Sequence, residues 1–249
     1  MLPNGLSAAR SVTVLTGAGI STDSGIPDFR GPQGVWTKDP NAAAMFTIDN
    51  YVADPDVRRR AWQSRRAHSA WTAEPNAGHD ALVALERAGK LRSIVTQNID
   101  GLHQKAGSSP EKVIEIHGTI WDVVCLSCGN RTPMAETLAR DEEDPACELC
   151  GGILKSATIS FGQSLEPDVL RAAVRAAQDC DLLLAVGTSL TVHPAAGLVD
   201  LALAAGARFI VVNAQPTPYD PVADTVIRDP ISQSLPALVA AVEAGVDGR

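Results

Sequence analysis

The sequence predicts an α/β fold in which helices cover both faces of a doubly wound parallel sheet. Short runs of β-branched and aliphatic residues alternate with helix-like stretches along the 249-residue chain. These runs are almost continuously apolar, which is typical of strands that are buried on both faces. A different α/β topology is the alternative that this pattern leaves open. Two segments interrupt the alternation and have a composition of their own.

Six apolar runs are the predicted strands. They are Ser11–Leu15, Ser93–Thr96, Val113–Ile116, Leu182–Val186, Phe209–Val212 and Thr225–Ile227. Because helix-like stretches separate several of them, we expect neighbouring strands to run parallel.

Three predicted helices lie between these strands. Gly78–Ala88 places Leu82 and Leu85 at helical spacing and ends near Gly89. Pro167–Gln178 and Pro194–Ala204 each open with a proline, a residue that is favoured in the first turn of a helix.

The two interrupting segments are interpreted as insertions that form a small second domain. Residues 31–79 hold three of the four tryptophans and a cluster of arginines. Residues 118–156 hold four of the five cysteines and the acidic stretch Asp141–Asp144.

Charge and hydropathy exclude several classes of protein. The chain has 21 Lys+Arg against 29 Asp+Glu, a net charge of -8, whereas general nucleic-acid binders are usually basic. An acidic surface instead suits lysine-bearing protein partners. No apolar run approaches the roughly 20 residues that span a bilayer, and Met1–Arg10 lacks the apolar stretch of a signal peptide. We therefore predict a cytoplasmic protein with no nucleic-acid or membrane partner; the oligomeric state is not indicated.

Four cysteines form the most specific motif of the sequence. Cys125 and Cys128 are separated by 18 residues from Cys147 and Cys150, in the pattern C-x2-C-x18-C-x2-C. This spacing is typical of a tetrathiolate zinc site, and four sulfur ligands leave no position for water, so we expect the zinc to be structural. Redox-active thiols and a zinc ribbon that binds nucleic acid are the alternatives.

A glycine-rich turn follows the first predicted strand. Gly17 and Gly19 come directly after an apolar run, and the next glycine is Gly25, so the usual dinucleotide fingerprint G-x-G-x-x-G is not met. Such a turn brings backbone N–H groups close to a pyrophosphate. A tight turn without a ligand explains the pattern about equally well.

Polar clusters follow three further predicted strands. They are Thr96-Gln97-Asn98-Ile99-Asp100, Gly187-Thr188-Ser189 and Asn213. Open α/β sheets bind ligands at the carboxyl ends of their strands, so these side chains are candidates for a binding site. His117 ends another predicted strand and is a candidate general base near neutral pH, although a histidine packed at the edge of an insertion is the simpler interpretation.

Taken in order, these motifs resemble those of the sirtuin family. The matching segments are Gly17-Ala18-Gly19-Ile20-Ser21, Ser24-Gly25-Ile26-Pro27-Asp28-Phe29-Arg30, Pro75-Asn76-Ala77-Gly78-His79, Thr96 to His103, Glu115-Ile116-His117-Gly118, the four cysteines, Gly187-Thr188-Ser189-Leu190 and Pro194-Ala195-Ala196. The resemblance implies a Rossmann-like NAD-binding domain formed by residues 1–30, 80–117 and 157–249. It also implies a small domain in which residues 31–79 form a helical module and residues 118–156 a zinc module.

The resemblance implies an NAD-dependent protein lysine deacylase, with deacetylation the favoured activity and acyl-lysine proteins as substrates. The acyl oxygen would attack the ribose C1′ as nicotinamide leaves, and a neutral imidazole at His117 would remove a ribose hydroxyl proton. The acyl group would then pass to ADP-ribose.

The resemblance also implies which residues of this chain hold NAD. It places Gly17, Ala18, Gly19, Ile20, Gly187 and Thr188 near the phosphates and ribose, Phe29, Arg30, Gln97, Asn98 and Asp100 near the nicotinamide and its ribose, and Ser189 and Asn213 near the adenosine.

Relatives that prefer acidic acyl groups carry a Tyr-x-x-Arg pair in the helical module. Counting back from Glu74-Pro75, the arginine position holds Arg66, whereas the tyrosine position holds Gln63. Desuccinylation or removal of another acyl group thus stays an alternative, as does mono-ADP-ribosyl transfer. A nicotinamide-dependent dehydrogenase is disfavoured, since the standard fingerprint is missing.

Overall fold

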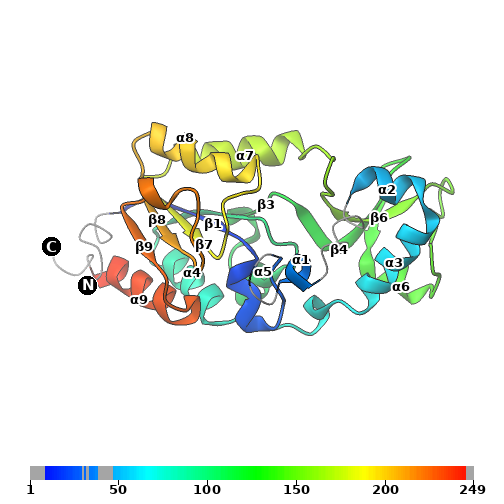
Figure 1. Cartoon of the computed structure of the whole chain (residues 1–249), viewed down its shortest axis with the longest axis horizontal. Helices are drawn as coiled ribbons and strands as arrows, with labels where there is room; N and C mark the ends of the chain where they lie inside the picture. The colour runs from blue at the N-terminus through cyan, green and yellow to red at the C-terminus, as the bar shows by residue number, and fades with distance from the viewer. Residues whose placement is uncertain (1–8, 30, 32–33, 39–46, 245–249) are drawn as a thin grey trace.

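The structure is a computed structural model that describes residues 9–29, 31, 34–38 and 47–244. The molecule is elongated, with a parallel sheet and its helices in one part and a smaller antiparallel sheet at the other end (Figure 1). Within the described ranges, no helix has the length and apolar character required to cross a membrane.

Six strands form the larger sheet in the order β3-β2-β1-β7-β8-β9, and every neighbouring pair is parallel. They are β1 (Val12–Thr16), β2 (Leu91–Thr96), β3 (Val113–Glu115), β7 (Leu182–Val186), β8 (Arg208–Val212) and β9 (Thr225–Ile227). All six predicted strands are confirmed, with ends that shift by at most two residues. From β1 the chain adds β2 and β3 on one side and then returns to add β7, β8 and β9 on the other side, which makes the sheet doubly wound.

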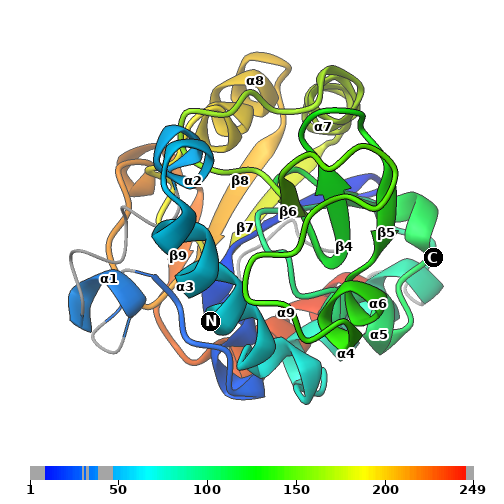
Figure 2. The ribbon, with the colours of Figure 1, turned by 90° about the vertical axis from the view of Figure 1, so that its right-hand side faces the viewer.

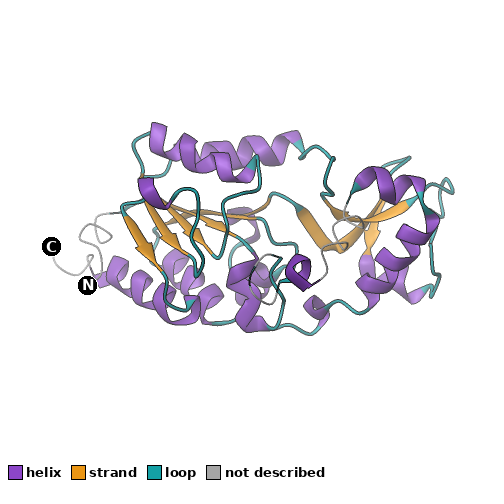
Figure 3. Ribbon diagram, viewed as in Figure 1, coloured by secondary structure: helices purple, strands orange, loops and turns teal. Residues whose placement is uncertain are grey.

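Helices cover both faces of this sheet (Figure 3). On one face lie α4 (Ala77–Arg87) and α9 (Ile231–Ala244), which pack on a cluster that includes Val14, Leu82 and Leu238. On the other face lie α7 (Pro167–Gln178) and α8 (Leu198–Ala204), which pack on Leu15, Ala173 and Phe209. Both faces of β1 and β7 are buried along their whole length, which explains their continuous apolar sequence.

The predicted helices are confirmed with one change. The segment predicted as Pro194–Ala204 begins as a short 3-10 helix, Ala195–Gly197, before α8 starts. Asn76 caps α4, since its side chain accepts a hydrogen bond from the N–H of Gly78 while His79 accepts one from the N–H of Asn76. Helix α5 (Leu102–Ala106) and helix α9 were not predicted.

The smaller sheet has the order β5-β4-β6 and is antiparallel (Figure 2). Its strands are β4 (Gly118–Cys125), β5 (Arg131–Pro133) and β6 (Leu154–Thr158), and the helices of this part are α2 (Ile48–Ala53), α3 (Pro55–Arg66) and α6 (Met134–Ala139). The short helix α1 (Val35–Lys38) lies in the middle of the molecule in Figure 1. Its buried apolar cluster has six members, two of which are the cysteines Cys125 and Cys147.

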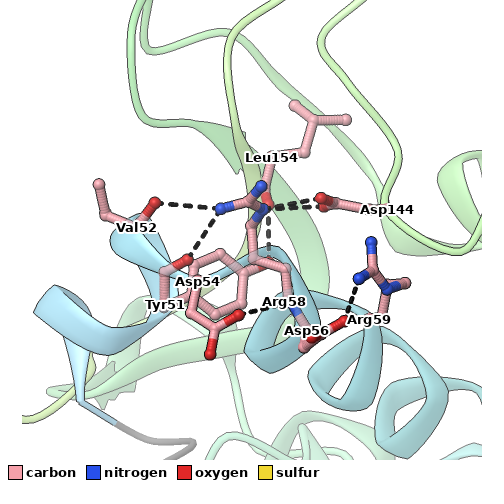
Figure 4. A network of polar contacts seen from close by, with 8 residues as sticks. All are labelled: Tyr51, Val52, Asp54, Asp56, Arg58, Arg59, Asp144 and Leu154. Carbon is pink, nitrogen blue, oxygen red and sulfur yellow. Dashed lines mark hydrogen bonds and ion pairs between the residues drawn. The ribbon is translucent and has the colours of Figure 1, made fainter.

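Arg58 links helix α3 to the acidic stretch between the cysteine pairs. Figure 4 shows its guanidinium group between the carboxylate of Asp144 and the carbonyl oxygens of Tyr51 and Val52. The hydroxyl of Tyr51 in turn donates to the carbonyl of Leu154 in β6, at 2.7 Å. These bonds join residues 47–66 to residues 118–158, beside the apolar contacts of Trp62 in the same cluster.

Candidate functional site

The site lies at the carboxyl edge of the parallel sheet, where strand order reverses. Thr16 at the end of β1 is in register with Thr96 of β2 and Val186 of β7, so the turns after these three strands meet. The N–H of Gly19 donates to the carbonyl of Gly187 at 2.8 Å. A Cβ on Gly19 would come within 2.7 Å of Gly187, and Gly187 has a φ of +63°, so both positions require glycine. Open α/β sheets bind ligands at such a reversal point.

Asn98 and Asp100 are anchored beside this turn by Ser21. The amide of Asn98 donates to the carbonyl of Gly17 at 3.1 Å and to the hydroxyl of Ser21 at 3.2 Å. The Ser21 hydroxyl donates to the carboxylate of Asp100 at 2.8 Å, and burial raises the pKa of this carboxyl. Ser21 was not among the predicted site residues, although a hydroxyl two positions after Gly19 was the available signal. The structure therefore brings Gly17, Gly19, Asn98 and Asp100 together.

Gln97 connects the turn after β2 with the turn after β7. Its side-chain amide donates to the hydroxyl of Thr188 at 2.9 Å, and its backbone carbonyl accepts a hydrogen bond from Nδ1 of His117 at 3.2 Å. A carbonyl can only accept, so Nδ1 of His117 carries the proton and Nε2 keeps its lone pair. Burial lowers the pKa of His117, so the ring is neutral at neutral pH with Nε2 ready to accept a proton.

Two buried histidines, His79 and His103, lie next to the ends of β1 and β2. Nε2 of His103 lies 3.0 Å from the hydroxyl of Thr16, which donates to the hydroxyl of Thr96 at 2.8 Å. The rings of His103 and His79 lie 5.1 Å apart. Burial lowers the pKa of His79 to about 4 and that of His103 to about 3. Both rings are therefore neutral parts of the scaffold.

The remaining predicted NAD contacts lie around this centre or outside the described residues. Ala18 and Ile20 belong to the 3-10 helix Ala18–Ser24 that follows Gly17, and Ile20 is buried. The Phe29 side chain is 36% exposed, and Arg30 lies outside the described residues. The hydroxyls of Ser189 and Thr191 lie 2.8 Å apart, whereas the amide of Asn213 donates to the carbonyl of Gln215.

The four predicted zinc ligands form one cluster. Their sulfur atoms all lie within 4.8 Å of one another; those of Cys125 and Cys150 are 3.6 Å apart, and those of Cys128 and Cys147 are 3.8 Å apart. Four sulfurs at about 2.3 Å from a tetrahedral zinc ion would be separated by about 3.8 Å, so the cluster fits this ion. Gly129 and Gly151 donate to the carbonyls of Cys125 and Cys147, which closes two equivalent turns around the site.

Neither member of the predicted acyl-binding pair lines the small cavity beside α3. The side chain of Gln63 is exposed, and the guanidinium of Arg66 donates to the carbonyls of Leu138 and Glu142 between the cysteine pairs. Arg65, one position earlier on the helix, lines a small cavity with Trp62 instead.

Comparison with known proteins identifies relatives along almost the whole chain. Residues 17–194 match the model of the Sir2 family. The chain is 55% identical over 231 residues to NAD-dependent protein deacetylase 2 of Streptomyces coelicolor, which covers 92% of this chain and 96% of the relative. It is 43% identical to the NAD-dependent protein deacetylase of Rhodopseudomonas palustris, over 92% of this chain and 91% of the relative.

Solved structures agree with these sequence relatives. A Sir2 structure with a p53 peptide and NAD+ has a TM-score of 0.83 at 33% identity, with 97% of this chain and 96% of that chain covered. A further Sir2 enzyme structure has a TM-score of 0.87 at 38% identity, over 96% and 95% of the two chains.

Proposed function

Because the chain belongs to the Sir2 family, we propose that it is an NAD-dependent protein lysine deacylase with acetyl-lysine proteins as its main substrates. The observation that carries the proposal is His117, which follows β3 at the carboxyl edge of the sheet; its Nδ1 is bonded to the carbonyl of Gln97, and its Nε2 keeps a lone pair. Among the relatives compared, proteins named NAD-dependent protein deacetylase are up to 55% identical in sequence to this chain.

NAD supplies the glycosidic bond between its ribose and nicotinamide. Cleavage of this bond leaves the ribose C1′ open to attack by the acyl oxygen of the substrate lysine. In this proposal Gly17, Ala18, Gly19, Ile20, Gly187 and Thr188 hold the phosphates and adjoining ribose, Phe29, Arg30, Gln97, Asn98 and Asp100 hold the nicotinamide half, and Ser189 and Asn213 hold the adenosine. The buried bonds of Asn98 and Asp100 fix their side chains before binding, which reduces the reorganisation that reaction requires.

His117 acts as the general base. Its neutral imidazole accepts a proton at Nε2 from a ribose hydroxyl, while the bond from Nδ1 to Gln97 stabilises the imidazolium that forms. Its lowered pKa keeps the ring unprotonated at neutral pH, which is the form that a base requires. The hydroxyl then attacks the acyl carbon, the bond from this carbon to the lysine nitrogen breaks and releases free lysine, and a water molecule adds to the acyl carbon so that acyl-ADP-ribose is the second product.

The zinc ion has a structural role in this proposal. Cys125, Cys128, Cys147 and Cys150 would saturate it with sulfur, so it would offer no open position for substrate. We also propose that residues 1–30, 80–117 and 157–249 act as the NAD-binding domain, with residues 31–79 and 118–156 as the helical and zinc modules of the small domain. A cytoplasmic location and the absence of a nucleic-acid partner complete the proposal.

Product analysis tests the function. The protein is incubated with acetyl-, propionyl- and succinyl-lysine peptides with and without NAD, and the products are weighed by mass spectrometry. We expect NAD-dependent formation of free lysine peptide, nicotinamide and acyl-ADP-ribose, fastest with the acetyl peptide. Transfer of ADP-ribose to protein without deacylation would instead support mono-ADP-ribosyl transfer and reject the proposal.

A further inference from the structure

A cavity of about 40 Å³ lies between helix α3 and strand β6. Its walls include Tyr51, Trp62, Arg65, Lys155 and Ile159. The N–H of Ile159 donates to the carbonyl of His117 at 2.8 Å, so the cavity adjoins the segment that holds the proposed base. Tyr51, which Figure 4 shows bonded to Leu154, forms another part of the wall.

Lys155 is a buried cation at this cavity. The residue is only 3% exposed, and its ammonium group donates to the backbone carbonyls of Ser156 and Thr158. An ammonium group has three protons, so one donor remains after these two bonds. Burial, with Arg65 nearby, lowers the pKa of Lys155 to about 8, because a buried charge without a counter-ion is disfavoured.

Two further donors line the same space. Nε of Arg65 donates to the hydroxyl of Ser156 at 3.3 Å, a long bond that leaves the other guanidinium donors of this side chain available. The indole of Trp62 is 1% exposed, and its N–H lies near the Tyr51 hydroxyl but forms no hydrogen bond of normal geometry with the described residues. The cavity is therefore lined by two cationic side chains and an indole N–H.

No carboxylate in the described part of the chain forms an ion pair with Arg65 or Lys155. Asp144, whose charge acts on Tyr51 of the cavity wall, is paired with Arg58. Buried cations are normally paired with an anion, so Lys155 and the neighbouring Arg65, with no carboxylate partner at this small cavity, favour an anion from outside the chain.

We propose that this cavity is a binding site for a small anion of the carboxylate or oxyanion class, held by Lys155 and Arg65. The anion has two possible sources: a free ion from solution, or the terminal carboxylate of an acidic acyl chain carried by the substrate lysine. The second source rests on the proposed function, whereas the first does not. The site uses neither Gln63 nor Arg66.

The first experiment measures thermal unfolding in phosphate or sulfate against chloride at matched ionic strength. It compares the wild type with Lys155→Met and Arg65→Met. Arg60→Met is the matched control, because Arg60 is an exposed arginine of the same helix outside the cavity. If the source is a free ion, the oxyanions raise the Tm of the wild type and of Arg60→Met by clearly more than they raise the Tm of the two cavity variants, which show only the general stabilisation by these salts. Lys155→Met should fold at least as well as the wild type in chloride, since an apolar side chain replaces an unpaired buried charge.

The second experiment compares kcat/KM for succinyl- and acetyl-lysine peptides in the same four proteins. If the source is the acyl carboxylate, the cavity variants lose tenfold or more with the succinyl peptide relative to the acetyl peptide, and Arg60→Met loses neither. Wild-type protein that shows no oxyanion stabilisation and no succinyl turnover would overturn the proposal. Equal changes in Tm and equal ratios of succinyl to acetyl turnover in the wild type and both cavity variants would also overturn it. A failure of all peptide turnover would reject the proposed function, while the thermal measurement would still report on the anion site.

Discussion

The parallel sheet and the small antiparallel sheet are stabilised in different ways. The parallel sheet has two buried apolar clusters, with 17 and 18 members among the described residues, one on each face. The small sheet has a cluster of six, and two of those six are cysteines of the proposed zinc site. Apolar burial is thus the main source of stability in the first region, whereas the second depends on metal ligation and on the bonds of Arg58 and Arg66.

This difference corresponds to a division of tasks. The proposed cofactor site lies at the edge of the well-packed sheet, where buried hydrogen bonds fix Asn98, Asp100 and Gln97. The small sheet contributes β6 and the segment that follows it, which pairs with His117. A change in either region should therefore impair activity, but only changes in the zinc region should do so by unfolding that region alone.

The largest effect is expected from loss of a zinc ligand. Cys128→Ser removes one of four thiolates from a site type that contributes about 10–16 kcal/mol to the folding of small zinc domains, so residues 118–156 should unfold. Hydrogen exchange should show loss of protection in β4–β6 with β1 and β7 still protected, and zinc content should fall. Cys180→Ala is the control, since Cys180 lies outside the cluster. Retained protection in β4–β6 would contradict the dependence on metal.

A smaller effect, confined to the sheet edge, is expected from Gly19→Ala. The new Cβ would lie 2.7 Å from the Cα of Gly187, so the turns after β1 and β7 must separate, at about 1–3 kcal/mol of stability. We expect NAD affinity, measured by calorimetry, to fall at least tenfold while zinc content is unchanged. Gly197→Ala is the matched control, because Gly197 has a helical φ of −66° and the new Cβ would lie 3.8 Å from its nearest neighbour. Equal NAD affinity in the two variants would show that the close approach of the turns is not required.

A third effect is confined to acid pH, where a single buried histidine below the sheet edge changes stability while the site at neutral pH is unaffected. Burial lowers the pKa of His79 to about 4 and of His103 to about 3, below the ordinary 6.5, so the unfolded chain binds more protons between these values. Each histidine should therefore reduce the free energy of unfolding by roughly 2 kcal/mol as pH falls from 7 to 5.

Glu115 has the opposite influence, because burial raises its pKa to about 7 and its protonation stabilises the fold as pH falls. The measurement is thus the difference between wild type and His103→Asn in urea unfolding at pH 7 and pH 5. The variant should lose less stability over this interval than the wild type. An equal loss in both proteins would mean that His103 titrates normally.

Most of the parallel sheet was predictable from the sequence, because strands buried on both faces leave continuous apolar runs such as Leu182–Val186. The strands of the small sheet were not predicted, since their cores consist of few residues and their positions depend on the cysteine turns. Helix α9 was missed because Pro236 lies inside it.

The candidate site shows the same contrast. Residues directly after strands, such as Gln97 and Gly187, could be located because parallel strands end at one edge. Ser21 and His103 act through contacts with Asn98 and Thr16 that join distant parts of the chain, which spacing alone does not indicate. The cavity lined by Arg65 and Lys155 forms because α3 packs near β6, which the sequence does not indicate. Alignment of the helical module by residue count pointed to Arg66 instead.

The most direct test of the proposed chemistry is His117→Ala, with two rates measured on the same protein. Because His117 is proposed to act only after nicotinamide has left, exchange of labelled nicotinamide into NAD should persist in the presence of acetyl peptide. Formation of acetyl-ADP-ribose should fall by roughly two orders of magnitude or more. Near wild-type formation of acetyl-ADP-ribose by the folded variant would contradict the assignment of His117 as the general base.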